Sequence, residues 1–379
     1  MQSRDERYFS APGRVEIGGN HTDHQRGRVL TAAVGLEIRA AAKPNGTNFV
    51  RLDYGGAGTD EIDLGAPDAH VYEKGTTAAL VSGVAEWFKR HGFLIGGFDA
   101  TISSSIPVGA GLSSSAAFTV LVGNVFKGLF EADISPIGIA HAGQFAENIF
   151  FGKPCGLMDQ TASSFGGLNI IDFVDPRNPV VTPVQAVIPG YSMCVVDTGG
   201  SHADLTPDYA SCTREMIAVA RHFGKDCLRE VSAGDFYSSI GSLRYLGDRA
   251  VLRAMHFFWD NDRVLNQAAA LESGDLATFF ELVIESGRSS LALLQNVFSP
   301  ADPQQQGLSL ALALSGRILD GAGAWRVHGG GFAGTILAFV PDGLKQEYSR
   351  QLGSVFGEES CHYLDIRQEG GGEVAKNSE

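Results

Sequence analysis

A stretch near the N-terminus, residues 11–24, gathers polar side chains within an otherwise apolar region, among them Arg14, His21 and Asp23. Arginine is a permanent cation whose planar donor fork suits phosphate. Histidine and aspartate can exchange hydrogen bonds with sugar hydroxyls. The segment is a candidate for binding phosphate and a sugar; a polar turn that caps the next element is the alternative.

A second segment, Pro107–Ala116, is a glycine-rich loop that leads directly into a helical sequence. Free N–H groups at a helix N-terminus point at an anion, and the helix dipole adds a favourable potential. The hydroxyls of Ser113, Ser114 and Ser115 add donors, or a ligand for Mg²⁺. The loop lacks the Gly-Lys-Ser/Thr ending of a Walker A motif. It therefore fits either a phosphate-binding loop or a flexible loop with serine N-caps.

A third segment, residues 146–160, carries two carboxylates, Glu147 near the end of a predicted helix and Asp159 in or just beyond a loop. Brought together, they would serve as metal ligand and base, although acidic residues at such a spacing are also common on surfaces. A fourth cluster, Arg326–Gly334, is either a tight loop against the site or a structural turn.

The elements that must position these segments form separate groups of strands and helices. Strands are predicted at 28–34, 36–41, 49–52, 61–64, 98–103, 168–172, 191–197 and 335–340, and helices at 76–91, 116–130, 137–150, 207–223 and 248–272. This segregation predicts an α+β fold. A length of 379 residues favours two domains, which we divide near a Pro-rich stretch into 1–180 and 181–379. The tail 369–379 is expected to be disordered.

The composition restricts the classes of partner. A formal net charge of −14 disfavours nucleic acid or an anionic membrane as a partner. The five cysteines are scattered and form no Cys-x-x-Cys pair, so a reducing cytoplasm is expected, with neither a disulfide framework nor a zinc site. No signal peptide or membrane-spanning run is apparent. We expect a cytoplasmic protein that is a monomer or a weak homo-oligomer.

Taken together and in this order, the four segments resemble the galactokinase family, within the galactokinase/homoserine kinase/mevalonate kinase/phosphomevalonate kinase superfamily. The segment 13–23 is similar to the family's sugar signature, and Pro107–Ala116 to the superfamily's ATP loop. The sequence Cys-Gly-Leu-Met-Asp-Gln at 155–160, preceded by Ala-Glu-Asn at 146–148, is close to the family's catalytic segment. Residues 326–334 resemble its third glycine motif.

The resemblance implies a two-lobed small-molecule kinase fold with its site in the cleft between the lobes. It also implies a reaction, the transfer of the γ-phosphoryl group of ATP to the anomeric hydroxyl of galactose with Mg²⁺ as cofactor. Asp159 corresponds to the catalytic aspartate and Arg14 to the arginine that stabilises the transferring group. The implied Mg²⁺ ligands are Ser115 and Glu147. The implied ATP contacts are Gly109, Gly111, Leu112, Ser113, Ser114 and Ser115, and the implied sugar contacts are Asn20, His21, Asp23 and Tyr209.

The sequence departs from the family pattern at several positions. Asn20 stands where a glutamate usually holds the sugar 6-hydroxyl, and His24 where tyrosine is common; Val327-His328 and Ala333 also differ. Because Asn20 removes a negative charge, the pocket is expected to accept hexuronic acids such as galacturonate as well. Kinases for galacturonate, N-acetylgalactosamine or arabinose are therefore alternatives to a galactose kinase. A non-catalytic sensor of ATP and sugar is another, which the intact segment 113–117 disfavours.

Overall fold

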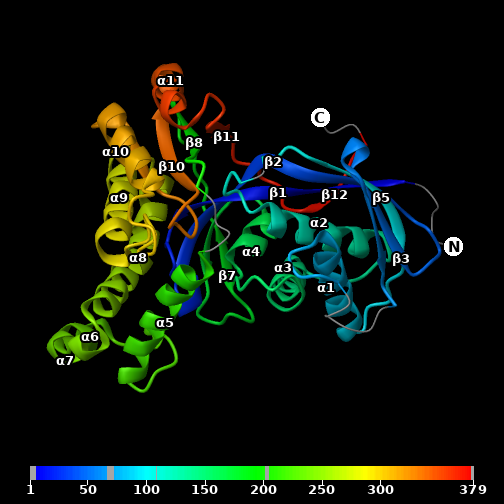
Figure 1. Cartoon of the computed structure of the whole chain (residues 1–379), viewed down its shortest axis with the longest axis horizontal. Helices are drawn as coiled ribbons and strands as arrows, with labels where there is room; N and C mark the ends of the chain where they lie inside the picture. The colour runs from blue at the N-terminus through cyan, green and yellow to red at the C-terminus, as the bar shows by residue number, and fades with distance from the viewer. Residues whose placement is uncertain (1–5, 66–71, 108, 201–204, 377–379) are drawn as a thin grey trace.

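The computed structural model describes residues 6–65, 72–107, 109–200 and 205–376, and within these the chain forms two lobes (Figure 1). The first lobe contains an eight-stranded sheet with the order β12-β1-β2-β5-β3-β4, to which β6 is added beside β2 and β7 beside β6. The second lobe contains a four-stranded sheet with the order β11-β8-β10-β9. Every pairing is antiparallel except that of β3 with β5.

The strands are β1 (Arg7–Gly18), β2 (Arg28–Pro44), β3 (Phe49–Asp53), β4 (Thr59–Asp63), β5 (Phe98–Ser104), β6 (Leu168–Asp172), β7 (Val180–Pro183), β8 (Tyr191–Asp197), β9 (Ala324–Val327), β10 (Thr335–Pro341), β11 (Cys361–Leu364) and β12 (Gly372–Val374). The α-helices are α1 (Thr77–Arg90), α2 (Ser114–Leu129), α3 (Pro136–Phe145), α4 (Met158–Phe165), α5 (Thr206–His222), α6 (Ala233–Ser238), α7 (Ile240–Leu243), α8 (Asp248–Glu272), α9 (Leu276–Ser289), α10 (Gly307–Leu319) and α11 (Lys345–Phe356). Two π-helical turns, Ala146–Phe151 and Ser290–Leu294, follow α3 and α9.

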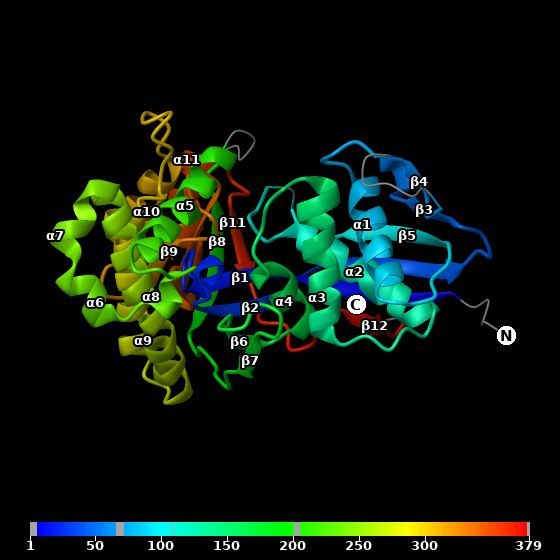
Figure 2. The same cartoon turned by 90° about the horizontal axis from the view of Figure 1, so that it is seen from below.

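The long pair β1 and β2 connects the two lobes. Both strands run out of the first lobe into the second, where they contact α8 (Figure 1, Figure 2). Their pairing is interrupted twice, between Pro12 and Arg14 and between Glu16 and Gly18. Bulges of this kind bend a strand and redirect its side chains, and Pro12 cannot donate to the ladder. The two irregularities flank the residues that β1 contributes to the site.

Helices α1 to α4 lie together on one face of the first sheet (Figure 2). Of these, α2 is buried almost all round, as expected of a central helix whose sequence is apolar on most faces. Phe126 packs against Phe88 and Phe98, with ring centroids 5.6 and 5.4 Å away. The N-terminus of α2, which follows the glycine-rich loop, is thereby held rigidly against the sheet.

The second lobe packs its sheet against α9, α10 and α11, while α5 to α8 form a separate apolar cluster. Helix α8 is the longest at 25 residues and carries a buried face that includes charged and polar residues. Strand β10 is buried along almost its whole length. No helix among the described residues is both long and apolar enough to cross a membrane.

The α+β prediction is confirmed, and some of the element predictions need correction. Residues 28–34 and 36–41 belong to one continuous strand, β2. The predicted helix 137–150 changes to a π-helical turn at Ala146. The predicted disorder of the tail is wrong for most of it, because β12 pairs with β1. The division at residue 180 stays a prediction: β7, which starts there, still belongs to the first sheet, and β12 returns to it.

Candidate active site

The glycine-rich loop before α2 presents unpaired main-chain N–H groups. Gly109 and Gly111 have φ angles of 83° and 68°, which glycine adopts without strain. A Cβ atom on Gly111 would lie 2.3 Å from Oγ1 of Thr335, so only glycine fits there. Ser113 precedes α2 in a left-handed conformation, and its side chain does not cap the helix. The first-turn N–H groups of α2 therefore remain available to an anion. Val108 lies outside the described residues.

Asp159 lies at the start of α4, where side chains from two other segments converge on it. Nε of Arg14, on β1, is 2.7 Å from Oδ1 of Asp159, and the Ser113 hydroxyl donates to Oδ2 at 2.5 Å. Arg14 also donates from Nη1 to the carbonyl of Gly111 at 2.8 Å. The structure thus brings the predicted catalytic pair together, directly beside the phosphate loop.

The environment keeps Asp159 ionised. Burial by itself would raise the pKa of this carboxyl, but the charge of Arg14 and hydrogen bonds from Arg14 and Ser113 hold the pKa below its usual value. Arg14 is 5% exposed, whereas the Asp159 side chain is 27% exposed and can be reached by a ligand. A carboxylate in this state can accept a hydrogen bond from a sugar hydroxyl at neutral pH.

Glu147 lies in the π-helical turn after α3, and its side chain is buried. Gln160 donates from Nε2 to Oε1 of Glu147 at 3.0 Å. Burial raises the pKa of Glu147, which a hydrogen bond with Ser115 partly offsets. Gly83 of α1 allows this turn to pack closely, because a Cβ there would lie 2.6 Å from Cα of Ala146.

The donors around Glu147 fit Mg²⁺. A carboxylate and a hydroxyl are hard oxygen ligands, and the buried amide oxygen of Gln160 has no hydrogen-bond partner of its own. The described residues hold no group of three or more His, Cys, Asp or Glu side chains arranged for a metal. Mg²⁺ in nucleotide sites usually takes only one or two carboxylates together with phosphate oxygens. Glu147 and Ser115 can supply that share.

His21 and His24 form a chain of hydrogen bonds that fixes their tautomers. Nε2 of His21 lies 2.9 Å from the carbonyl of Gly330 and must donate to it, so Nδ1 accepts from Nε2 of His24 at 3.1 Å. Burial, together with the neighbouring histidine, lowers the pKa of His21 to about 3; burial lowers that of His24 to about 4. Both rings are therefore neutral at physiological pH, and the two nitrogens of His21 already have protein partners.

Asp23 and Tyr209 lie on opposite sides of the same region. A Cβ atom on Gly156 would be only 1.9 Å from Oδ2 of Asp23, so this carboxylate rests on the main chain just before Asp159. Burial raises the pKa of Asp23. Tyr209 donates to the carbonyl of Gly331 at 3.1 Å, and its ring lies against Gly330. Asp23 thus lies near Asp159, whereas Tyr209 lies against the third glycine motif.

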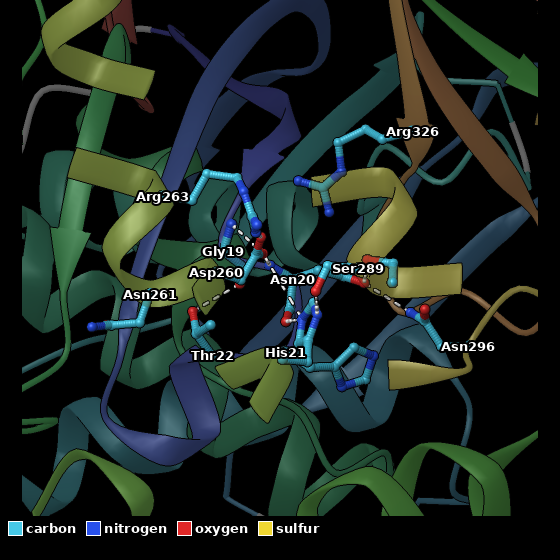
Figure 3. A network of polar contacts seen from close by, with 12 residues as sticks. Gly19, Asn20, His21, Thr22, Asp260, Asn261, Arg263, Ser289, Asn296 and Arg326 are labelled. Atoms are coloured by element: carbon cyan, nitrogen blue, oxygen red, sulfur yellow. Dashed lines mark hydrogen bonds and ion pairs between the residues drawn. The ribbon is translucent and has the colours of Figure 1, made fainter. Parts of the chain in front are cut away.

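Asn20 is fully buried, and its side-chain amide is saturated by the protein (Figure 3). Its Nδ2 donates to Oε1 of Glu16 at 2.9 Å and to the carbonyl of Gly329 at 2.7 Å. Its Oδ1 accepts from Ser290 at 3.2 Å and from Asn296 at 2.8 Å. An amide offers two donors and two acceptor positions, so none is left for a sugar. The predicted contact between Asn20 and the sugar C6 group would require one of these bonds to break.

Asp260 of α8 and Arg326 of β9 hold the same segment in place. Oδ2 of Asp260 accepts from the main-chain N–H groups of Gly19 and Asn20 at 3.1 and 2.8 Å (Figure 3). Arg326 donates to Glu16 at 3.0 Å and to the carbonyl of Ile17 at 2.7 Å. Asp260 gives no sequence signal, because it is a lone aspartate inside a helix. Arg326 is apparent from the sequence only as the first residue of the fourth cluster.

Three carbonyl groups of the third glycine motif accept hydrogen bonds from side chains. The oxygens of Gly329, Gly330 and Gly331 accept from Asn20, His21 and Tyr209, respectively. With the carbonyl oxygens of Gly329–Gly331 occupied, the motif has one fixed orientation against the sugar signature. The fourth cluster is thus a tight loop against the site, one of the two alternatives that the sequence left open.

Comparisons with known proteins agree with this geometry. Residues 79–167 match the family model described as the GHMP kinases N-terminal domain, and residues 1–44 match the galactokinase galactose-binding signature. Both matches lie in the N-terminal half of the chain, which is thus similar to GHMP kinases and to galactokinases. The matched ranges contain Arg14 and the sugar signature, the phosphate loop, Glu147 and Asp159.

Solved structures of small-molecule kinases share this fold. The chain is similar to Lactococcus lactis galactokinase, determined with galactose, at a TM-score of 0.83 and 24% identity, covering 98% of this chain and 95% of that one. It is also similar to Methanococcus jannaschii mevalonate kinase (TM-score 0.66, 15% identity, 96% and 98% coverage) and to Streptococcus pneumoniae phosphomevalonate kinase (0.62, 12%, 97% and 99%). The TM-scores show that the fold is shared. Because the sequence identities are low, the substrate must be argued from the site.

The buried network around Asn20 predicts a stability effect. We expect Asn20→Glu to lower the free energy of unfolding by about 3–5 kcal/mol, because it removes two buried donors and sets a second carboxylate against Glu16. Urea unfolding followed by fluorescence measures this. The same change at Asn266, on the exposed face of α8, serves as the control and should alter stability by less than about 0.5 kcal/mol. Unchanged stability of Asn20→Glu would show that the amide is not locked in this network.

The neutral histidine pair predicts a dependence of stability on pH. The folded-state pKa of His24 is lowered to about 4, so this group binds fewer protons in the folded than in the unfolded protein. Its contribution is complete above about pH 6.5 and is lost as pH falls towards 4. Wild type should therefore lose stability more steeply than His24→Gln in this window, by up to about 1.4 kcal/mol per pH unit. Parallel curves from urea unfolding at pH 7, 6 and 5 would contradict the assignment.

Proposed function

We propose that this chain is a sugar 1-kinase that transfers the γ-phosphoryl group of Mg-ATP to the anomeric hydroxyl of galactose or a closely related hexose. The observation that carries the proposal is the convergence of Arg14, Ser113 and Asp159 beside the phosphate loop. The galactose-binding signature at residues 1–44 supports a hexose of the galactose type as the acceptor.

The proposed mechanism divides the work among residues of this chain. The N–H groups of the loop and of the first turn of α2 hold the ATP phosphates. Asp159 orients the sugar hydroxyl and receives its proton late in the reaction, which contributes roughly 10²–10⁴-fold. Arg14 stabilises the charge that is spread over the transferring group. Glu147 and Ser115 would hold Mg²⁺, which supplies charge neutralisation at the phosphates.

The sugar is held by side chains around Asp159. Asp23 rests on Gly156, just before this carboxylate, and Tyr209 lies against Gly330 of the third glycine motif, where we place the sugar between them. The neutral His21 closes the same space through its bond to Gly330. Because Asn20 has no free hydrogen-bonding position, we assign the polar selection of the sugar to Asp23, Asp159 and Tyr209.

A panel of sugars tests the proposal. ADP release is measured in a coupled assay with galactose, galacturonate, N-acetylgalactosamine, arabinose and glucose, each with Mg-ATP. We expect turnover with galactose or another galacto-configured sugar well above the rate without sugar. A flat response to every sugar would reject the kinase proposal and favour a sensor of ATP and sugar instead.

Asp159→Asn separates binding from turnover. The amide keeps the size of the side chain but cannot accept the hydroxyl proton, so kcat should fall by about 10²–10⁴-fold while sugar and nucleotide still bind. Calorimetry measures binding, and the coupled assay measures kcat. Near-normal turnover would place the catalytic group elsewhere. Asp172→Asn, an ion-paired aspartate on β6 outside this site, is the control and should leave kcat unchanged.

A further inference from the structure

Lys153 lies in a short loop between Glu147 and Asp159 whose main chain is held on both sides. The N–H groups of Gly152 and Lys153 both donate to the carbonyl of Glu147, at 2.9 and 3.0 Å. Gly152 has the left-handed conformation that ends the π-helical turn. The loop therefore keeps Lys153 next to the carboxylate that is suited to Mg²⁺.

Asn148 holds the end of this loop that precedes Asp159 through two hydrogen bonds to the main chain of Cys155. Its Oδ1 accepts from the N–H of Cys155 at 2.7 Å, and its Nδ2 donates to the carbonyl of the same residue at 3.3 Å. Gln144 donates to that carbonyl as well, at 3.3 Å. Pro154, which follows Lys153, restricts the backbone of Lys153 to extended conformations. The position of the Lys153 main chain is thus determined by contacts on either side of it.

The ammonium group of Lys153 is exposed, and its charge reaches the site. It lies near enough to help lower the pKa of Asp159, after the larger effects of burial, Arg14 and Ser113, and it also opposes the burial that raises the pKa of Glu147. Arg14 is committed to Asp159 and Gly111. Within the described part of the chain, no ion pair engages Lys153, so its charge is available to a ligand.

A second positive charge, besides that of Arg14, would balance the negative charges of this site. Asp159 lies near enough to both Glu147 and Asp23 for its charge to raise the pKa of each, so three carboxyl groups gather where the proposed kinase would hold the terminal phosphate. The transferring group carries its charge on three equatorial oxygens, and an ammonium group acts on such oxygens as a compact point charge.

We propose that Lys153 binds the γ-phosphate of ATP from the side of Glu147 and accompanies the phosphoryl group during its transfer. This inference rests on the proposed kinase function. Lys153 lies within the third segment, residues 146–160, where the sequence suggested a chemical role only for Glu147 and Asp159. Because ADP lacks the γ-phosphate, Lys153 should distinguish ATP from ADP, whereas a residue that holds only the α- and β-phosphates would not.

The test compares Lys153→Met with Lys153→Arg and Lys74→Met. Lys74 is the matched control: it is an exposed lysine whose side-chain stem packs against Gly152, 2.8 Å from where a Cβ atom on that glycine would lie. Binding of Mg-ADP and of the Mg complex of the β,γ-imido analogue of ATP is measured by calorimetry, and kcat and KM by the coupled assay.

We expect Lys153→Met to weaken the ATP analogue about 10- to 100-fold while ADP binding changes by less than about 3-fold, as for the loss of one charge-assisted hydrogen bond. The kcat should fall with the affinity for the analogue, Lys153→Arg should restore most of both, and Lys74→Met should match wild type. Equal weakening of ADP and the analogue, or an effect of Lys74→Met as large as that of Lys153→Met, would overturn the proposal.

The two proposals fail in different ways. If no sugar is phosphorylated but the ATP analogue still depends on Lys153, the kinase proposal fails and the phosphate contact stands. If sugar is phosphorylated and Lys153→Met has wild-type kinetics and binding, only the role of Lys153 is wrong. A protein that binds neither nucleotide would overturn both.

Discussion

The buried end of β1, from Glu16 to Asn20, is the constraint on which the rest of the site depends. Here residues from the first lobe exchange hydrogen bonds with α8, with the π-helical turn after α9 and with the third glycine motif. A buried polar network stabilises one arrangement when its members are satisfied, and it is costly when they are not. The side chain of Asn20 is satisfied at every position, whereas Oδ1 of its partner Asn296 has no partner among the described residues. The bonds of Asn20 to Ser290, Asn296 and Gly329 hold the end of β1 against the second lobe.

Charge is distributed unevenly between this junction and the catalytic pair. At the junction, burial raises the pKa of Glu16 to about 7 although Arg326 lies beside it, and Asp260 is held below its usual pKa by His256, Arg326 and Arg263 against the effect of burial. At the catalytic pair, Arg14 keeps Asp159 ionised. Because burial keeps His21 and His24 neutral, these two rings add no positive charge to the site.

The sequence pointed to the predicted ligand-binding residues more readily than to the residues that hold them in place. Arg14, Ser113 and Asp159 come from segments whose residue types already suggested phosphate chemistry, and they do converge. Apart from Glu16, the partners of Asn20 lie 236 to 309 residues away along the chain. No local pattern reveals such pairs, and Asp260 in α8 looks like an ordinary solvated position until tertiary packing buries it. The β12 strand is equally hidden, because three residues with two adjacent glycines carry no strand signal of their own.

In the proposed kinase, the junction would let one strand align two substrates. Arg14 lies on β1, and Asn20 and His21 lie in the turn that follows this strand. The phosphate loop is tied to that strand, because the N–H of Arg14 donates to the carbonyl of Leu112. The second lobe holds the end of this strand through several hydrogen bonds. Asn20 and His21 donate to the carbonyls of Gly329 and Gly330. Asp260 accepts from the N–H groups of Gly19 and Asn20, and Arg326 donates to Glu16. In the proposed kinase, the alignment of phosphate donor and sugar would therefore depend on β1 and on these bonds to the second lobe.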